Sequence, residues 1–315
     1  MMSAKQNVSR GQLLLDEPMS RHTSWRVGGP ADRVYIPADL ADLAAFVKTL
    51  RVDEPLYWVG LGSNLLVRDG GVRGTVILTS GALNELTTNA DGVMRAEAGV
   101  ACAKAARFSV NHGYVGAEFL AGIPGTIGGA LAMNAGAFGG ETWNIVQAVE
   151  TLDRRGVIRT RTPADYRVTY RHVDGPDNEW FIAGHFKLAK GEASKAKTLI
   201  KSLLAKRGAT QPTQLPNAGS VFKNPPNDHA ARLIESCGLK GTREGNACVS
   251  DLHANFIVNL GGASAADIER LILRVQSVVE KQKGVRLEAE VRVIGESNES
   301  HQRTNSPSPS GRGKG

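Results

Sequence analysis

The hydrophobic and polar positions in the first half of the chain change repeatedly between the helical and the strand-like period. Residues 38–50 carry apolar side chains every three or four positions, which predicts a helix with one buried face. Short apolar runs at residues 33–36, 56–60 and 76–80 are typical of buried strands. The alanine-rich residues 101–113 predict a second helix. These elements indicate a mixed chain that starts with a β-α-β unit.

The second half shows the same mixture, with one long amphipathic helix near its end. Residues 264–283 form an apolar stripe with Ser264 and Asp267 as an N-terminal capping box and Gly284 as the stop signal. Residues 285–294 then alternate strictly between apolar and charged side chains, which predicts a strand. Between residues 113 and 264 we predict five further elements. They are a hairpin that turns at residues 154–156, a strand at 179–189, a basic helix at 194–208, a short helix at 228–238 and a strand at 255–260.

The uncharged stretch between Glu118 and Glu141 has the most unusual composition in the chain. A membrane-spanning helix needs ~20 predominantly apolar residues, but this stretch holds seven glycines together with Pro124 and Asn134. Each glycine inside a helix costs ~1 kcal/mol relative to alanine, so a long helix is disfavoured. Two interpretations are open: a glycine-rich packing loop, or turns whose backbone N–H groups bind an anion such as a diphosphate.

A second glycine turn covers residues 60–65, directly after a predicted strand, where phosphates commonly bind. The third glycine of the dinucleotide fingerprint would fall at Leu65, and no G-x-x-x-x-G-K-[ST] motif occurs, so we reject a Rossmann fold and a P-loop. A simple hairpin turn is the alternative. The polar pair Ser63 and Asn64 favours a phosphate contact.

Length, charge and residue counts narrow the class of protein. The 315 residues suffice for two domains of ~150 residues each. The net charge of +7 comes without a basic run interleaved with aromatic residues, which favours an anionic small substrate over nucleic acid. Three cysteines without a C-x-x-C pair, and an N-terminal apolar run of only residues 13–15, predict a cytoplasmic protein without membrane insertion. The seven histidines show no ligand spacing, so we predict no metal site.

Three residues combine reactive side chains with constrained backbone. Arg171 follows Tyr170 at the end of an alternating run and can grip a carboxylate with two hydrogen bonds. Ser220 follows Gly219 on a tight turn, which differs from the G-x-S-x-G elbow of hydrolases. Glu290 lies on the charged face of the predicted strand. Each has a plainer alternative: a surface arginine, a structural serine, and an exposed strand face with ion pairs.

Seven motifs occur in the order of one known family: TSWRVGGPA (23–31), VGLGSNLLV (59–67), AGIPGTIGGALAMNAGA (121–137), YR (170–171), NAGSVFKNP (217–225), HANFIVN (253–259) and LEAEVRVIG (287–295). They resemble the UDP-N-acetylenolpyruvoylglucosamine reductase family, and the short spacing between Arg171 and the strand at 179 resembles its type II members. The resemblance implies an α+β fold, with a two-subdomain FAD-binding fold of the p-cresol methylhydroxylase/vanillyl-alcohol oxidase type and a C-terminal α/β substrate domain. The implied division is a loose lead-in at 1–20, an FAD-binding domain at 21–191 with subdomains of about 21–88 and 89–191, a substrate-binding domain at 192–296 and a disordered tail at 297–315.

The resemblance also implies an activity. Members of this family use NADPH and FAD to reduce UDP-N-acetylglucosamine enolpyruvate to UDP-N-acetylmuramate for the bacterial cell wall. Arg171 and Glu290 match the residues that stabilise the enolate-like intermediate, and Ser220 matches the proton donor to C2. Because an ionised Glu290 would repel an anion, we expect its pKa to be raised.

Ligand contacts follow from the same resemblance. The implied cofactor contacts are Gly60, Gly62, Ser63, Asn64, Leu65, Gly122, Ile123, Pro124, Gly125, Thr126, Gly128 and Gly129. The implied substrate contacts are Tyr170, Arg207 and Asn224. Two alternatives remain: an FAD-dependent oxidase on the same fold, and a non-catalytic protein that binds a nucleotide sugar or flavin. The basic tail has no counterpart in the family, and the sequence gives no information about protein partners.

Overall fold

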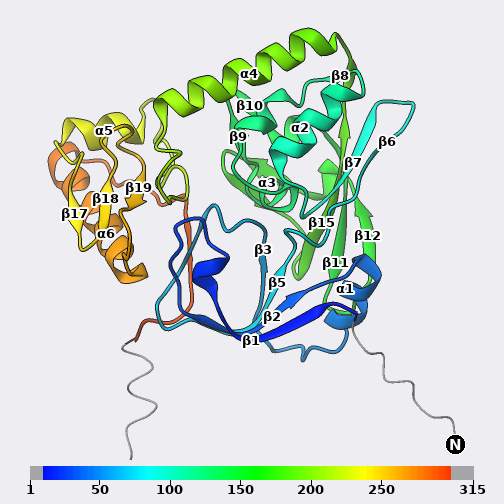
Figure 1. Cartoon of the computed structure of the whole chain (residues 1–315), viewed down its shortest axis with the longest axis horizontal. Coiled ribbons are helices and arrows are strands. Elements are labelled where there is room, and N and C mark those ends of the chain that lie inside the picture. The colour runs from blue at the N-terminus through cyan, green and yellow to red at the C-terminus, as the bar shows by residue number, and fades with distance from the viewer. Residues whose placement is uncertain (1–9, 299–315) are drawn as a thin grey trace, which may run out of the picture.

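The computed structural model describes residues 10–298, so the predictions for residues 1–9 and 299–315 lie outside the described part. Figure 1 shows three regions. The first strands form the lower region, a larger sheet with helices forms the upper region, and the C-terminal region lies to the left. Helix α4 (Ala193–Thr210) crosses the top of the view from the upper region towards the C-terminal region.

The lower region is a four-stranded sheet with the order β1 (Gln12–Pro18), β2 (Pro30–Ile36), β5 (Val72–Leu78) and β3 (Leu56–Val59). Strands β2, β5 and β3 run parallel, and helix α1 (Leu40–Val47) connects β2 to β3. The predicted β-α-β unit is confirmed, with β5 between its two strands.

The predicted loose lead-in at residues 1–20 is wrong for residues 12–20, which lie in β1 and in the short 3-10 helix η1 (Met19–Arg21). Strand β1 pairs antiparallel with β2 at the edge of the sheet. Its Leu13 and Leu15 side chains stay exposed. Main-chain pairing with β2 and the partly buried Leu14 hold this strand, so the sequence shows only a weak pattern of buried side chains there.

The upper region contains a five-stranded antiparallel sheet with the order β12 (Ile158–Arg161), β11 (Val146–Asp153), β15 (Glu179–Lys187), β7 (Val93–Glu97) and β6 (Leu86–Thr88). Helices α2 (Cys102–Asn111), α3 (Ile127–Met133) and α4 pack with it, and Figure 1 shows all three above the lower sheet. The predicted hairpin, strand and helices are confirmed. Ala196 and Ile200 of α4 lie in this core, so α4 packs on the upper region although the predicted boundary is residue 192. That boundary stays a prediction.

The C-terminal region holds a three-stranded sheet and two helices: β17 (Arg243–Glu244), β18 (Ala247–Val249), β19 (Ile257–Asn259), α5 (Ala230–Ser236) and α6 (Ala265–Lys283). Both capping predictions for α6 are confirmed, because Ser264 and Asp267 form a capping box and Gly284 ends the helix in the left-handed conformation. The buried stripe of α6 packs into the core of this region.

The predicted strand at residues 285–294 is wrong for most of its length. Only β20 (Arg292–Ile294) is a regular strand, and it pairs parallel with β4 (Leu65–Val67) of the lower region. Leu287 and Val291 are buried as the alternation predicts. The segment before β20 is extended but makes a single bridge, from Ala289 to Phe222. The alternation of apolar and charged residues is typical of a strand, but no long strand lies beside residues 285–291 to pair with them.

The remaining elements are short. They are β8 (Tyr114–Val115), β9 (Gly136–Ala137), β10 (Gly140–Glu141), β13 (Arg167–Thr169), β14 (His172–Asp174), β16 (Ala189–Lys190), η2 (Glu118–Gly122), η3 (Thr142–Ile145) and η4 (Pro163–Asp165).

Trp25 joins the start of the chain to the C-terminal region. Its side chain is 0% exposed and packs in the core that contains α6. The indole Nε1 donates a hydrogen bond of 2.7 Å to the carbonyl of Ile257, and Asn259 Nδ2 donates to the carbonyl of Trp25 at 2.9 Å. The segment before β2 is therefore part of the C-terminal core.

We expect Trp25→Ala to lower the free energy of unfolding by about 3–5 kcal/mol, because a large buried side chain is replaced by a cavity. Chemical denaturation followed by circular dichroism measures this change. Trp25→Phe keeps most of the ring but removes the donor to Ile257, so we expect a smaller loss. A Trp25→Ala protein as stable as the wild type would contradict this role.

Candidate functional site

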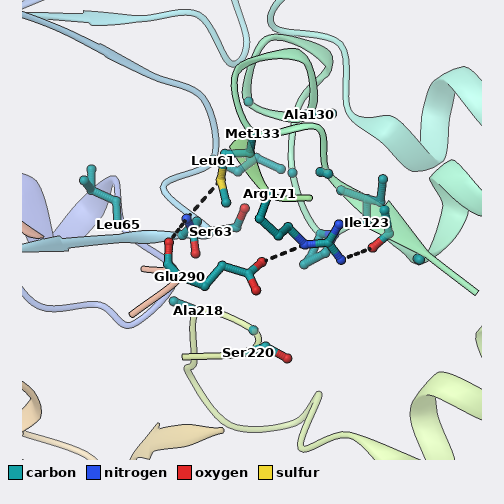
Figure 2. A pocket seen from close by; sticks show the side chains of 18 of the residues that line it. Leu61, Ser63, Leu65, Ile123, Ala130, Met133, Arg171, Ala218, Ser220 and Glu290 are labelled. Carbon is teal, nitrogen blue, oxygen red and sulfur yellow. Dashed lines mark hydrogen bonds and ion pairs between the residues drawn. The ribbon is translucent and has the colours of Figure 1, made fainter. Parts of the chain in front are cut away.

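A cavity of about 540 Å³ lies where the three regions meet. Its wall contains the turn between β3 and β4, the stretch between η2 and α3, the tip of the β13–β14 hairpin and parts of the C-terminal region. Figure 2 shows Arg171 and Glu290 facing each other across its interior, with Ser220 on the segment below them. All three predicted catalytic residues therefore line one cavity.

The two glycine turns singled out in the sequence lie against each other in this wall. A Cβ atom on Gly60 would come within 2.3 Å of Thr126 Oγ1, so only glycine permits this contact. Within residues 10–298, none of the backbone amides of residues 60–64 is donated to another protein group. The same holds for Gly125 and Thr126. Free amides that converge from two turns form a concavity that suits a diphosphate.

Helix α3 borders this concavity, with Gly129 and Ala130 in the cavity wall. It starts directly after Thr126, whose side chain caps it by accepting a hydrogen bond from Gly129 N. The N–H groups of Ile127, Gly128 and Gly129 are all donated within the protein, so α3 leaves none of them for a ligand. The free amides that precede the helix, at residues 60–64, Gly125 and Thr126, favour the anion-binding interpretation over a simple packing loop. The donor set, made of neutral amides and the Ser63 hydroxyl, fits the phosphates of FAD.

The implied cofactor contacts line the cavity with one exception. Gly128 is absent from its wall, because its N–H donates to the Ala98 carbonyl at 2.9 Å and a Cβ there would come within 2.9 Å of Ala98 Cβ. Gly128 therefore lets α3 approach the strand region and offers no donor to a ligand. The other eleven positions remain candidates for the cofactor contact.

We expect Gly62→Ala to weaken FAD binding at least tenfold, because Gly62 has φ +59° and a Cβ would come within 2.1 Å of the His22 carbonyl. The turn would have to move, and its free amides would move with it. Binding of FAD to apoprotein, followed by flavin fluorescence, measures the effect. Gly113→Ala is the matched control, since Gly113 also has a positive φ of +77° but a Cβ there meets nothing within 4 Å. Equal affinities of the two variants would contradict the proposed cradle.

Arg171 lies at the tip of the two-residue β13–β14 hairpin, where Thr169 pairs with His172. Its φ of +55° is unusual for a residue with a side chain. The guanidinium donates to Glu290 Oε1 at 3.1 Å and to the carbonyls of Asn134 and Gly136 at 3.2 and 3.0 Å. The backbone carbonyls hold the guanidinium in the cavity, so the surface-arginine alternative is excluded.

Glu290 is the acid opposite Arg171, and only 14% of its side chain is exposed. Burial raises the pKa of Glu290 above its ordinary value, while the nearby Arg171 guanidinium acts in the opposite direction. The expected direction is therefore confirmed. The neighbouring Glu288 is exposed and pairs with Lys223, so the two acids have different environments although the alternation puts them on one face.

Ser220 follows Gly219, which has φ +72°. The chain after Ser220 is held by Asn255, a residue that sequence reasoning missed. Asn255 accepts from Val221 N at its carbonyl, accepts from Phe222 N at Oδ1 and donates from Nδ2 to the Phe222 carbonyl. In the sequence, the only sign of a role for Asn255 is its place in the HANFIVN motif.

The three implied substrate residues are placed differently. Tyr170 and Asn224 line the cavity, and Asn224 Oδ1 also accepts from Ala230 N at the start of α5. Arg207 is not in the wall; it donates to Gln211 Oε1 at 3.2 Å, and Gln211 lines the cavity. Burial lowers the pKa of Arg207 from its ordinary value. The structure therefore brings Tyr170 and Asn224 to the site directly, and Arg207 through Gln211.

Two further searches cover the described residues. Among residues 10–298, no helix combines the length and apolar character that a membrane crossing requires. In the same part of the chain, no group of three or more His, Cys, Asp or Glu side chains is arranged so that it could hold a metal ion.

Comparison with known proteins adds independent information. A family model described as the C-terminal domain of UDP-N-acetylenolpyruvoylglucosamine reductase matches residues 211–294, and a model described as an FAD binding domain matches residues 31–161. Proteins named UDP-N-acetylenolpyruvoylglucosamine reductase from Alkalilimnicola ehrlichii and Legionella pneumophila (strain Corby) are 58% and 56% identical to the chain. The first match covers 94% of this chain and 99% of the relative, and the second covers 95% and 97%.

A solved structure gives the same result. The enzyme of that name from Thermus caldophilus matches with a TM-score of 0.77 and 33% sequence identity, over 91% of this chain and 99% of that one. The fold combines an FAD-binding domain with the C-terminal domain of this reductase family, in agreement with the predicted α+β class. On these matches, the chain belongs to the UDP-N-acetylenolpyruvoylglucosamine reductase family.

Proposed function

We infer that this protein is an FAD-containing oxidoreductase that uses NADPH to reduce UDP-N-acetylglucosamine enolpyruvate to UDP-N-acetylmuramate, a precursor of peptidoglycan. The observation that carries this function is the Arg171–Glu290 pair, which lines one cavity with Ser220 and with the free amides of residues 60–64. This reaction requires a cation for the substrate carboxylate, a neutral acid and a proton donor, and the guanidinium of Arg171, the mostly buried carboxyl of Glu290 and the hydroxyl of Ser220 can supply them. We place the activity in the cytoplasm.

The cradle would hold the cofactor through backbone donors. The amides of residues 60–64, Gly125 and Thr126 would bind the diphosphate, and the Ser63 hydroxyl stands beside them. When bound, FAD supplies a two-electron carrier between NADPH and the substrate. The protein's own contribution is to position the substrate and to stabilise the charge that develops on it.

Arg171 is the residue that would bind the substrate carboxylate. Addition of a hydride at C3 of the enolpyruvyl group leaves an electron pair at C2 that spreads into the carboxylate. The guanidinium is already held by the carbonyls of Asn134 and Gly136, so it needs little reorganisation to stabilise this charge. Protonated Glu290 would donate a hydrogen bond to the same anion.

Ser220 would then donate its hydroxyl proton to C2, which completes the saturated ether, and its oxygen recovers a proton from water. A serine hydroxyl is a weak acid, so its placement must count for more than its acidity. The backbone grip of Asn255 on Val221 and Phe222 supplies a fixed position.

The visible spectrum of the purified protein tests the function. We expect a flavin spectrum that bleaches with NADPH under anaerobic conditions and returns when UDP-N-acetylglucosamine enolpyruvate is added. A flavin that returns only with O₂ would instead support an oxidase. A protein that cannot be loaded with FAD would contradict both functions.

A further inference from the structure

Asn64 makes an unexpected set of contacts for a residue in a phosphate-binding turn. Its Nδ2 donates to the carbonyl of Glu290 at 3.0 Å and to Met133 Sδ at 3.0 Å. Dashed lines in Figure 2 mark both interactions, at the labelled Glu290 and Met133. The side-chain donor of Asn64 is therefore used within the protein, and only its main-chain amide remains for a ligand.

The backbone around Glu290 is held from both sides. The carbonyl of Asn64 accepts from Arg292 N at 2.9 Å, so Asn64 contacts the chain at Glu290 and again two residues later. From the opposite side, Glu290 N donates to the carbonyl of Val221 at 2.8 Å, next to Ser220. The main chain of Glu290 is thus hydrogen-bonded to the turn at residues 60–65 on one side and to the segment that carries Ser220 on the other.

We propose that Asn64 is a positioning residue, which aligns the Glu290 carboxyl with Arg171 and so couples the cofactor turn to the acid that faces the substrate. Its two hydrogen bonds with the backbone of residues 290–292 fix the position of the Glu290 main chain, from which the carboxyl extends towards Arg171. The 3.1 Å contact between Arg171 and Glu290 depends on that starting point, because Arg171 is anchored separately by Asn134 and Gly136. The proposal rests on the function inferred above.

Ser63 offers a contrast within the same turn. A Cβ on Gly125 would come within 3.3 Å of Ser63 Oγ, so this hydroxyl lies against the opposite glycine turn and at the cradle. Ser63 is thus suited to a cofactor contact, whereas Asn64 is turned towards Glu290. Two adjacent residues should therefore affect different steps.

The experiment separates cofactor binding from the two half-reactions. Asn64→Leu keeps the approximate shape of the side chain and removes both donors, and Asn64→Ala serves as a second variant if the first folds poorly. We expect FAD affinity and the rate of bleaching by NADPH to stay within threefold of the wild type. We expect reoxidation of the reduced flavin by the enolpyruvyl substrate to slow by about 10- to 100-fold, because a small misplacement of a catalytic group has an effect of this size.

Ser63→Ala is expected to show the reverse pattern, with weaker FAD binding and a substrate step near the wild-type rate once the protein is saturated with FAD. A second measurement does not depend on turnover. The titration of the Glu290 carboxyl, followed by infrared difference spectroscopy with Glu290→Gln for assignment, should shift to higher pH in Asn64→Leu. The reason is that a displaced carboxyl loses part of its contact with Arg171.

Each outcome decides the proposal. If Asn64→Leu reoxidises at the wild-type rate with an unchanged Glu290 titration, Asn64 does not position the acid. Parallel losses of FAD affinity and of both half-reactions would show that Asn64 serves only the structure of the turn, which also overturns the proposal. If the wild-type protein itself is not reoxidised by the enolpyruvyl substrate, the inferred function fails, and the positioning role fails with it.

Discussion

Ser220→Ala is expected to leave bleaching of the flavin by NADPH unchanged and to slow reduction of the enolpyruvyl substrate by about 10²–10⁴-fold, the usual contribution of a positioned proton donor. The two half-reactions separate because only the second needs a proton at C2. Ser220 is well placed for this role, since Asn255 holds the two residues that follow it and Gly219 provides the turn before it. Anaerobic stopped-flow absorbance measures both rates.

The control is Ser277→Ala, which removes an exposed hydroxyl from α6. It should leave both half-reactions unchanged. A Ser220→Ala protein that reduces the substrate at the normal rate would show that the proton comes from another group.

The second large effect is expected at Glu290. Because burial raises the pKa of Glu290, its protonated form persists above the ordinary range of a glutamate. As pH rises through the raised pKa, the carboxyl ionises and repels the anion that forms on the substrate. The rate of the second half-reaction should therefore fall with rising pH. Below that pKa, where the wild-type carboxyl is protonated, Glu290→Leu can neither donate nor ionise and should lower the rate by about 10²–10³-fold.

Glu290→Gln tests the protonation state directly. Glutamine is neutral at every pH and keeps an N–H donor, so the decline of the rate with rising pH should disappear. Glu288→Gln is the matched control, since Glu288 lies two residues away but is exposed and paired with Lys223. Its pH profile should equal that of the wild type. A Glu290→Gln protein with an unchanged pH dependence would assign that decline to another group.

Local chemistry explains most of what could be predicted from the sequence. The helix at 264–283 was predictable at both ends, because a capping box and a left-handed glycine act within a few residues of each other. The two glycine turns were recognisable from residue type alone, because glycine takes positive φ and lets another backbone approach closely. The partners that approach, Thr126 at Gly60 and His22 at Gly62, are visible only in the structure. The order of the motifs then indicated the family and, through it, Arg171, Ser220 and Glu290.

Long-range pairing explains what could not be predicted. Strand β1 exists because β2 offers it an edge, and residues 285–291 are not a regular strand because no long strand lies beside them. The contacts within the site also join residues that lie far apart in the chain. The Asn64 side chain donates to the carbonyl of Glu290, 226 residues later in the chain, and Asn255 holds the segment after Ser220.

By itself, the sequence determined the turns, the helix ends and the identity of the reactive side chains, since these depend on neighbouring residues and on residue type. Only the tertiary structure decided which of those side chains share a cavity, which donors remain free for a ligand, and what raises the pKa of Glu290. The burial of Glu290 and its hydrogen bonds with Arg171 and Asn64 come from the packing of the three regions. These partners lie more than a hundred residues apart in the chain, so no local pattern encodes the contacts.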